Sequence, residues 1–99
     1  MPILFLPKPH KTLQKINPQD SIEIVELIKE LEENEELGTR LKYELNEFFS
    51  LHHKKYRIIY TIKNGDILIV YIGLRKKAYD EVKKLLKRIF DQIKSEDSE

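Results

Sequence analysis

Two arginines and a tyrosine in the second half of the chain have side chains that can act on a phosphate group. Arg57 lies inside the apolar run 56–62, Arg75 lies just past the apolar run 67–73, and Tyr79 follows four residues later. A guanidinium group is planar, stays charged, and presents a fork of N–H donors that matches the oxygens of a phosphate. Arg57, Arg75 and Tyr79 therefore form a candidate phosphate site, provided that the fold brings them together.

The turn between the two apolar runs is the clearest local structural signal in the sequence. Asn64-Gly65 separates two stretches rich in β-branched and aromatic residues. A type I′ turn needs positive φ at both of its central residues, and Asn-Gly is the pair that adopts this conformation most readily. We therefore expect a β-hairpin of strands 56–62 and 67–73, with Arg57 inside the first strand and Arg75 just past the end of the second.

Length and composition predict one small domain. The 99 residues, of which 40% are hydrophobic, suffice for one compact core, and we expect residues 1–94 to form it, followed by a disordered acidic tail at 95–99. The chain contains no cysteine, which excludes disulfides and thiolate metal sites. Apolar runs fall short of the roughly 20 residues of a membrane span. The stretch 3–6 is too short for a signal peptide, so we expect a cytoplasmic protein without a membrane partner.

Charge is distributed unevenly along the chain. The formal net charge is +1, yet residues 20–47 carry ten acidic and three basic side chains, whereas residues 54–94 carry twelve basic and four acidic ones. A basic second half indicates a face that binds a polyanion. The competing interpretation is a solvated surface rich in Lys and Glu, as in heat-adapted proteins, and charge alone leaves the two open.

The order of predicted elements is β-α-α-β-β-β-α, an α+β domain with a largely antiparallel sheet. Residues 2–7 form an edge strand between prolines. A helix over 9–16 follows, and Asn17 and Pro18 begin a second helix that runs to about residue 33. Strands are expected near 41–45, where leucine, tyrosine and leucine alternate, and at 48–52, before the hairpin. Helical periodicity returns from residue 76. The expected apolar face of the second helix consists of Ile22, Ile24, Val25, Leu27, Ile28 and Leu31.

The central part of the sequence resembles the RelE/ParE toxin superfamily. The similarity lies in Ser50-Leu51-His52, then Tyr56-Arg57-Ile58-Ile59-Tyr60, a hairpin, and Gly73-Leu74-Arg75-Lys76-Lys77-Ala78-Tyr79. By element order it extends over roughly residues 3–90. It implies a RelE-like fold and a toxin of a type II toxin–antitoxin pair, with a cognate antitoxin, the ribosome and mRNA as partners. Arg57, Arg75 and Tyr79 fall on family positions, and the resemblance implies that they are catalytic.

Two activities are known in this superfamily, and the resemblance leaves both open. RelE-like members are ribosome-dependent mRNA endonucleases, whereas ParE-like members poison DNA gyrase and are not nucleases. Some nucleolytic members carry a lysine pair on the strand before the hairpin, and Phe48 and Ser50 occupy those places here. A mRNA-cleaving toxin is the leading hypothesis. A non-enzymatic protein of the same fold, either a gyrase inhibitor or a decayed toxin that only binds its antitoxin, is the alternative.

RNA cleavage needs neither a metal nor a cofactor if the 2′-hydroxyl attacks the adjacent phosphate, and we expect none. The protein must then accept a proton, stabilise charge on the phosphate oxygens and protonate the leaving oxygen. His52 and His53 titrate near neutrality and are the candidate acid and base. Adjacent strand residues point to opposite faces, so these two histidines are not expected to bind one metal ion.

Other residues have a plain structural interpretation beside the functional one. Lys54, Lys55, Lys76 and Lys77 are the candidate RNA-binding cations, but lysines are also common on solvated surfaces. Arg57 can pair with a glutamate on the sheet, and periodicity alone favours Tyr79 as a core residue. Tyr60 and Tyr71 are expected to pack together across the hairpin. A general RNA-binding module ranks last, because no exposed aromatic platform is predicted.

Overall fold

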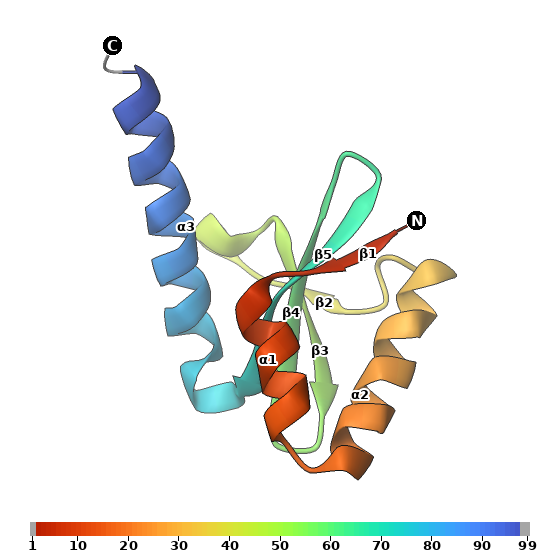
Figure 1. The fold of residues 1–99 in the computed structure, drawn as a ribbon. Helices are drawn as coiled ribbons and strands as arrows, with labels where there is room; N and C mark the ends of the chain where they lie inside the picture. The colour runs from red at the N-terminus through yellow and green to blue at the C-terminus, as the bar shows by residue number, and fades with distance from the viewer. Residues whose placement is uncertain (1, 98–99) are drawn as a thin grey trace.

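The computed structural model describes residues 2–97, with side chains up to residue 88. One mixed sheet has the strand order β1-β5-β4-β3-β2 and is covered by helices on both faces (Figure 1). The predicted α+β order is confirmed, with one short strand and two single turns added. The elements are β1 Ile3–Phe5, α1 Pro7–Lys15, α2 Pro18–Lys29, η1 Glu30–Glu32, β2 Thr39–Arg40, η2 Tyr43–Leu45, β3 Phe48–His53, β4 Tyr56–Lys63, β5 Asp66–Leu74 and α3 Arg75–Asp97.

The two faces of the sheet carry separate hydrophobic clusters. Helices α1 and α2 pack on one face, where Ile24, Ile28 and Leu31 meet Ile58 and Tyr60. Helix α3 packs on the other face together with η2; that cluster comprises Leu41, Leu45, Phe48, Ile59, Val70, Ala78 and Val82. Alternation along a strand sends neighbouring side chains to opposite faces, so each central strand contributes to both clusters.

The helical hairpin follows its predicted capping signals. The Asn17 side chain accepts a hydrogen bond of 2.8 Å from the backbone N–H of Gln19, and Pro18 is the first helical residue. Helix α2 ends at Lys29, earlier than expected, and continues as the 3₁₀ turn η1. The predicted apolar face is too broad, because Ile22 is 54% exposed.

The predicted β-hairpin is confirmed, with an irregularity that its sequence does not announce. Asn64 and Gly65 have φ values of 52° and 81°, as a type I′ turn requires. Ile59 pairs with Tyr71 but Tyr60 pairs with Ile69, so Val70 is an extra residue in β5. The bulge places Tyr60 and Tyr71 on opposite faces, and the expected packing of these two tyrosines across the hairpin is wrong.

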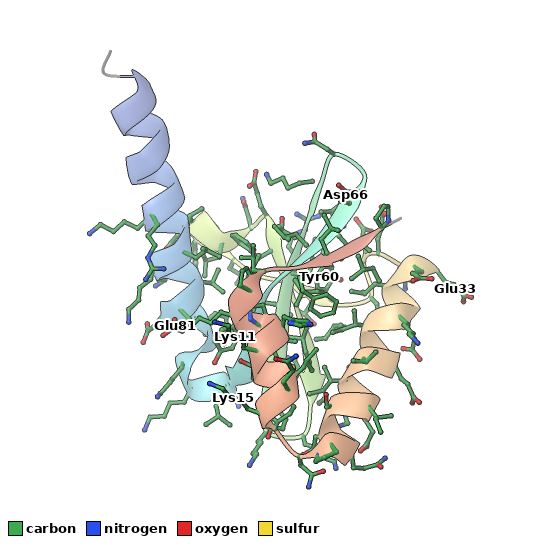
Figure 2. The ribbon with its side chains drawn as sticks, viewed as in Figure 1. Lys11, Lys15, Glu33, Tyr60, Asp66 and Glu81 are labelled. Atoms are coloured by element: carbon green, nitrogen blue, oxygen red, sulfur yellow. The ribbon has the colours of Figure 1, made fainter. Side chains whose placement is uncertain are left out.

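Tyr60 anchors the segment between α2 and β2. Its ring stacks on Phe49 with centroids 5.1 Å apart. Its hydroxyl donates to the Glu35 carbonyl at 2.8 Å and accepts from the Gly38 N–H at 3.0 Å. Burial raises the pKa of this hydroxyl. Figure 2 shows Tyr60 in the interior, whereas Glu33 extends from the surface.

Two further predictions need correction. The expected strand near 41–45 is not formed, because β2 ends at Arg40 and Tyr43–Leu45 is the 3₁₀ turn η2. Helix α3 runs to Asp97, so residues 95–97 are helical although they were expected in a disordered tail. Residues 98–99 of that tail lie outside the described residues. Over the range 2–97, none of the helices combines the length and apolar character of a membrane span.

Candidate functional site

Three neighbouring strands place His52, Arg57 and Gly73 in one row near the end of the sheet. His52 of β3 pairs with Arg57 of β4, which pairs with Gly73 of β5. Alternation puts this row on the same face as Phe48 and Ile59, which is the face that α3 covers. The glycine contributes no side chain, and the Tyr71 ring lies where a side chain of residue 73 would begin.

The first residue of α3 brings the second guanidinium to this row. Arg75 directly follows β5, and its backbone N–H donates to the Lys55 carbonyl at 3.4 Å. The partial burial of the His52 ring lowers the pKa of its imidazole below 6.5, and the positive charges of Arg57 and then Arg75 lower it further. His52 and Arg57 pair across β3 and β4, and Arg75 begins α3 two residues after Gly73, so the backbone places all three residues near the same end of the sheet.

Neither Arg57 nor Arg75 forms an ion pair with a carboxylate of the described side chains. Arg57 is half-buried, and its Nη1 donates to the carbonyl of Tyr56 at 3.1 Å. Arg75 is exposed, and no ion pair formed by residues 2–88 includes either guanidinium. The predicted pairing of Arg57 with a glutamate is therefore not seen, and both forks have donors left for an anion.

Tyr79 lies one helical turn after Arg75, on the same side of α3. Its side chain is 47% exposed, so the expectation that it belongs to the core is wrong. Ala78 and Val82 are the residues of this stretch that enter the core, each 1% exposed. Tyr79 instead lines an open hollow between α3 and the segment 39–45.

His53 and Lys54 lie on the opposite face and do not join the candidate site. The His53 Nε2 is 3.9 Å from Asp20 and 3.7 Å from Glu23, while the Lys54 ammonium is 3.0 Å from Asp20. The hydrogen bond to Asp20, followed by the charges of both carboxylates, raises the pKa of Lys54. His53, Asp20 and Glu23 approach one another closely enough to share a metal ion, but the Lys54 ammonium already supplies the positive charge there.

The remaining predicted RNA-binding lysines are distributed around the site. The Lys55 ammonium is 5.5 Å from the centre of the Tyr56 ring. Lys55 lies in the turn between β3 and β4, and its carbonyl accepts the hydrogen bond from the Arg75 N–H. Lys76 is exposed on the first turn of α3. Lys77 points to a groove between α1 and α3. Lys55, through its backbone carbonyl, and Lys76, as the next residue, are thus the two predicted RNA-binding lysines that adjoin Arg75.

The positions of the family's lysine pair are part of the core. Phe48 and Ser50 precede His52 on the same face of β3, and they are only 6% and 4% exposed. The Ser50 hydroxyl has no hydrogen-bond partner among the described residues. Neither residue supplies a cation, and His52 is the first polar side chain of this face of β3 that reaches solvent.

Tyr71 holds the end of β5 that leads into Arg75. Its hydroxyl donates to the Leu74 carbonyl at 2.9 Å, and a Cβ at position 73 would lie only 2.5 Å from that hydroxyl oxygen. Gly73 is therefore needed for the tyrosine ring to lie over the strand. Burial and the nearby Glu81 carboxylate raise the pKa of Tyr71.

Tyr43 is a surface residue that sequence reasoning missed. It is 84% exposed, and its backbone has a left-handed φ of 59°. This conformation destabilises the folded chain by about 1–2 kcal/mol for a non-glycine residue. The alternating pattern Leu41-Tyr43-Leu45 predicts a strand, and it therefore does not predict the left-handed backbone of Tyr43.

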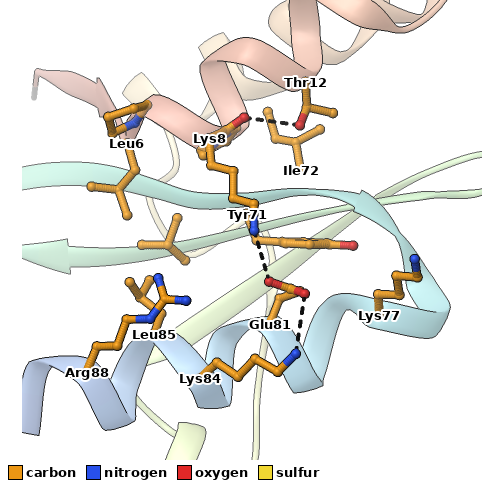
Figure 3. Close-up of a pocket in the computed structure, with 13 residues that line it drawn as sticks. Leu6, Lys8, Thr12, Tyr71, Ile72, Lys77, Glu81, Lys84, Leu85 and Arg88 are labelled. Atoms are coloured by element: carbon orange, nitrogen blue, oxygen red, sulfur yellow. Dashed lines mark hydrogen bonds and ion pairs between the residues drawn. The ribbon is translucent and has the colours of Figure 1, made fainter.

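A separate groove of about 600 Å³ lies between α1 and α3 over β5 (Figure 3). Leu6, Val70 and Leu85 contribute its apolar lining. Its rim is basic. Glu81 of α3 is 3.4 Å from Lys8 of α1, which joins the two helices, and 3.9 Å from Lys84 on its own helix. The cations along the groove are Lys8, Lys77, Lys84 and Arg88.

Comparison with known proteins gives a family match and several similar structures. The family model described as the ParE toxin of the type II toxin–antitoxin system parDE matches residues 5–79. The toxin–antitoxin complex RelBE2 from Mycobacterium tuberculosis has 26% identity over 75% of this chain and 96% of that one, with a TM-score of 0.64. The YoeB–YefM complex from Staphylococcus aureus has 24% identity over 76% and 97%, with a TM-score of 0.65.

A third structure extends the likeness of the fold. A mutant of the E. coli toxin RelE in the free state has 14% identity over 89% of this chain and 96% of that one, with a TM-score of 0.72. The predicted RelE-like fold is thereby confirmed. No curated protein sequence matches this chain.

Proposed function

This chain belongs to the family of ParE toxins of type II toxin–antitoxin systems, and we propose that it acts by cutting mRNA on the ribosome. The observation that supports this activity is the meeting of His52, Arg57 and Arg75 at one end of the sheet. Tyr79 stands one turn further along α3 and is accessible to solvent. This set offers an imidazole, two guanidiniums and a phenol on neighbouring strands and on the first turns of α3.

Each group has a role in cleavage by the RNA's own 2′-hydroxyl. The lowered pKa of His52 keeps its imidazole neutral at pH 7, so it accepts the proton of the attacking hydroxyl. Arg57 and Arg75 bind the non-bridging phosphate oxygens, on which charge increases in the transition state. The Tyr79 phenol gives its proton to the leaving 5′-oxygen. The products are a 2′,3′-cyclic phosphate and a 5′-hydroxyl, and water restores both protonation states.

The ribosome positions the message and so compensates for the weak acid–base groups of this site. An imidazole of lowered pKa is a weak base, and positions 48 and 50 provide no cation. Holding the message with its 2′-hydroxyl in line with the scissile bond compensates for imperfect acid–base groups. The basic second half of the chain contributes to docking on ribosomal RNA, and that attraction weakens as salt rises.

Gyrase inhibition is the second candidate function, and two observations favour it. The matching family model is that of ParE toxins. In addition, Phe48 and Ser50 are buried at the places where some nucleolytic relatives carry lysines. Under this hypothesis the arginines bind a protein surface or DNA, and no bond is cleaved by the toxin.

The two functions are separated by adding purified protein to a reconstituted translation reaction and mapping message ends by primer extension. We expect cuts within the message on ribosomes and little cleavage of the same RNA without them. Arg57→Ala and Arg75→Ala should abolish the cuts, while the control Lys63→Ala, at the far end of the hairpin, should not. Intact message together with loss of supercoiling by added DNA gyrase would support the second function instead.

The groove between α1 and α3 is the proposed docking site of a cognate antitoxin. The M. tuberculosis and S. aureus structures are toxin–antitoxin complexes, which supports a protein partner of this kind. An apolar floor with four rim cations and one acidic residue fits an amphipathic helix with acidic flanks. The partner therefore binds beside the candidate site rather than within it.

Antitoxin docking is tested by co-purification with the product of a neighbouring open reading frame. The double variant Lys84→Glu/Arg88→Glu reverses charge on the rim and should weaken the complex by at least tenfold. The matched control Lys29→Glu/Lys63→Glu changes the net charge equally on other surfaces and should leave it intact. Equal weakening by both variants would argue against the groove.

A further inference from the structure

We propose that the hollow between α3 and the segment 39–45 binds one unpaired RNA nucleotide, whose base stacks on Tyr43. The inference rests on the proposed function, because it places this nucleotide next to the phosphate held by Arg57 and Arg75. The hollow has a volume of about 440 Å³ and lies on the same side of the sheet as α3. Tyr79 lines the hollow and, as the proposed acid, connects it to the proposed cleavage site.

The conformation of Tyr43 is the observation that carries the proposal. An aromatic residue rarely occupies the left-handed region, and the left-handed φ of 59° is unfavourable for it. A side chain that is 84% exposed gains almost no packing in return. Glycine would be the favourable residue at this position for folding alone. Because neither the backbone conformation nor packing favours tyrosine at position 43, we infer that its exposed ring binds a partner.

The segment around Tyr43 is held firmly enough to act as a platform. Leu41 and Leu45 are both buried on either side of Tyr43. The Leu41 N–H donates to the Phe48 carbonyl at 2.9 Å, and the Asn46 N–H donates to the Tyr43 carbonyl at 3.1 Å. These contacts fix the backbone while leaving the tyrosine ring outside, so stacking a base on it requires little ordering of the protein.

Charge around the hollow favours a nucleotide over an uncharged aromatic ligand. Arg40, Lys42 and Lys83 line it together with one acidic residue, Glu44. Glu44 is 3.7 Å from Lys83. The Arg40 guanidinium donates to the Asn46 carbonyl at 2.8 Å and lies over the Phe49 ring at 4.7 Å, with Glu36 at 3.9 Å, so its charge is already engaged. Lys42 is exposed and has no ion-pair partner within the described side chains, so it is available for a phosphate.

The chemistry of the site predicts stacking without base selection. Every base has a π-face, and binding on tyrosine together with backbone cations tolerates any sequence. The hollow thus adds a binding site for one nucleotide of the message beside the cleaved bond. An antitoxin side chain occupying the same hollow is the competing outcome.

The test measures binding rather than cleavage, using a short single-stranded RNA with one 2-aminopurine at low salt. Stacking on tyrosine should quench the probe, and Tyr43→Gly should remove the quenching and weaken binding by about tenfold. Tyr43→Phe should retain both. Tyr43→Gly should also raise the melting temperature, on the order of 4 °C, because glycine relieves the strained backbone. Ile22→Ala, a truncation of an exposed apolar residue on α2, should change none of these.

Each outcome separates the inference from the proposed function. Quenching that depends on Tyr43, in a protein that leaves ribosomal message uncut, would support the nucleotide site and refute the nuclease. Cleavage that proceeds normally in Tyr43→Gly, with unchanged RNA binding, would overturn the inference alone. Loss of antitoxin binding in Tyr43→Gly with unaltered RNA affinity would assign the hollow to the antitoxin and overturn it as well.

Discussion

His52 and Arg57 occupy opposing positions on β3 and β4, on the face of the sheet that α3 covers. Two groups that are both positive when protonated would repel each other in this arrangement. The imidazole is the only one of the two that can lose its proton near neutral pH. The pairing therefore leaves a neutral proton acceptor beside a permanent cation, which is a useful combination for phosphate chemistry.

The titration of His52 should depend on its arginine neighbours. Partial burial, then Arg57, then Arg75 lower its pKa from 6.5, so Arg57→Ala should move the pKa back up, and Arg75→Ala should move it up by less. Following the imidazole proton resonances with pH by NMR measures both shifts. Lys63→Ala is the matched control, and an unchanged His52 titration in Arg57→Ala would contradict the proposed proximity.

The lowered pKa of His52 also sets the sign of two pH dependences. The unfolded chain binds this proton more readily than the folded chain, so the free energy of unfolding should rise with pH from the lowered pKa up to about 6.5, and the contribution should be constant above that. If His52 is the base, message cleavage should increase over pH values around its lowered pKa and stay level at higher pH. His52→Gln should flatten both profiles in this range.

Replacing each arginine by lysine tests whether the guanidinium fork matters. Lysine keeps the charge but loses bidentate donation, so Arg57→Lys should retain only part of the activity, while Arg57→Ala should lose about 100-fold or more. Cleavage rates on ribosomes measure this difference. If lysine and arginine prove equivalent, the site works by charge alone.

Gly73→Ala should disturb both stability and activity through Tyr71. The new methyl group would meet the tyrosine hydroxyl, and forcing the ring aside should lower the free energy of unfolding by about 1–3 kcal/mol. Urea unfolding measures the loss. Tyr71→Leu removes the clash, so the double variant should be more stable than the sum of the two single effects predicts. Simple additivity would mean that the two residues do not interact.

Tyr60→Phe should destabilise the fold without touching the candidate site. It removes the partner of the Glu35 carbonyl and of the Gly38 N–H, for which we expect a loss of about 1–3 kcal/mol. Tyr79→Phe, which removes an exposed hydroxyl, should change stability by less than about 0.5 kcal/mol while reducing cleavage. Chemical denaturation of both variants, with cleavage assayed in parallel, separates the structural tyrosine from the functional one.

The sequence by itself determined the features that depend on a few adjacent residues. Asn64-Gly65 specified the hairpin because the turn conformation depends on those two residues alone, and Asn17-Pro18 specified the start of α2 in the same way. Strand alternation likewise separated His52 from His53, as the sequence predicts. Arg57 and Arg75 were identified as partners from their places in the hairpin pattern.

The tertiary structure decided everything that depends on which face an element presents to its neighbours. The extra residue Val70 in β5 turned Tyr71 and Gly73 to the face that α3 covers, away from Tyr60. Tyr79 became accessible since Ala78 and Val82 took the core positions of α3. Tyr43 lies on the surface at the start of the 3₁₀ turn η2, between the buried Leu41 and Leu45. Periodicity within a segment cannot show such choices, which are made by contacts between residues far apart in the chain.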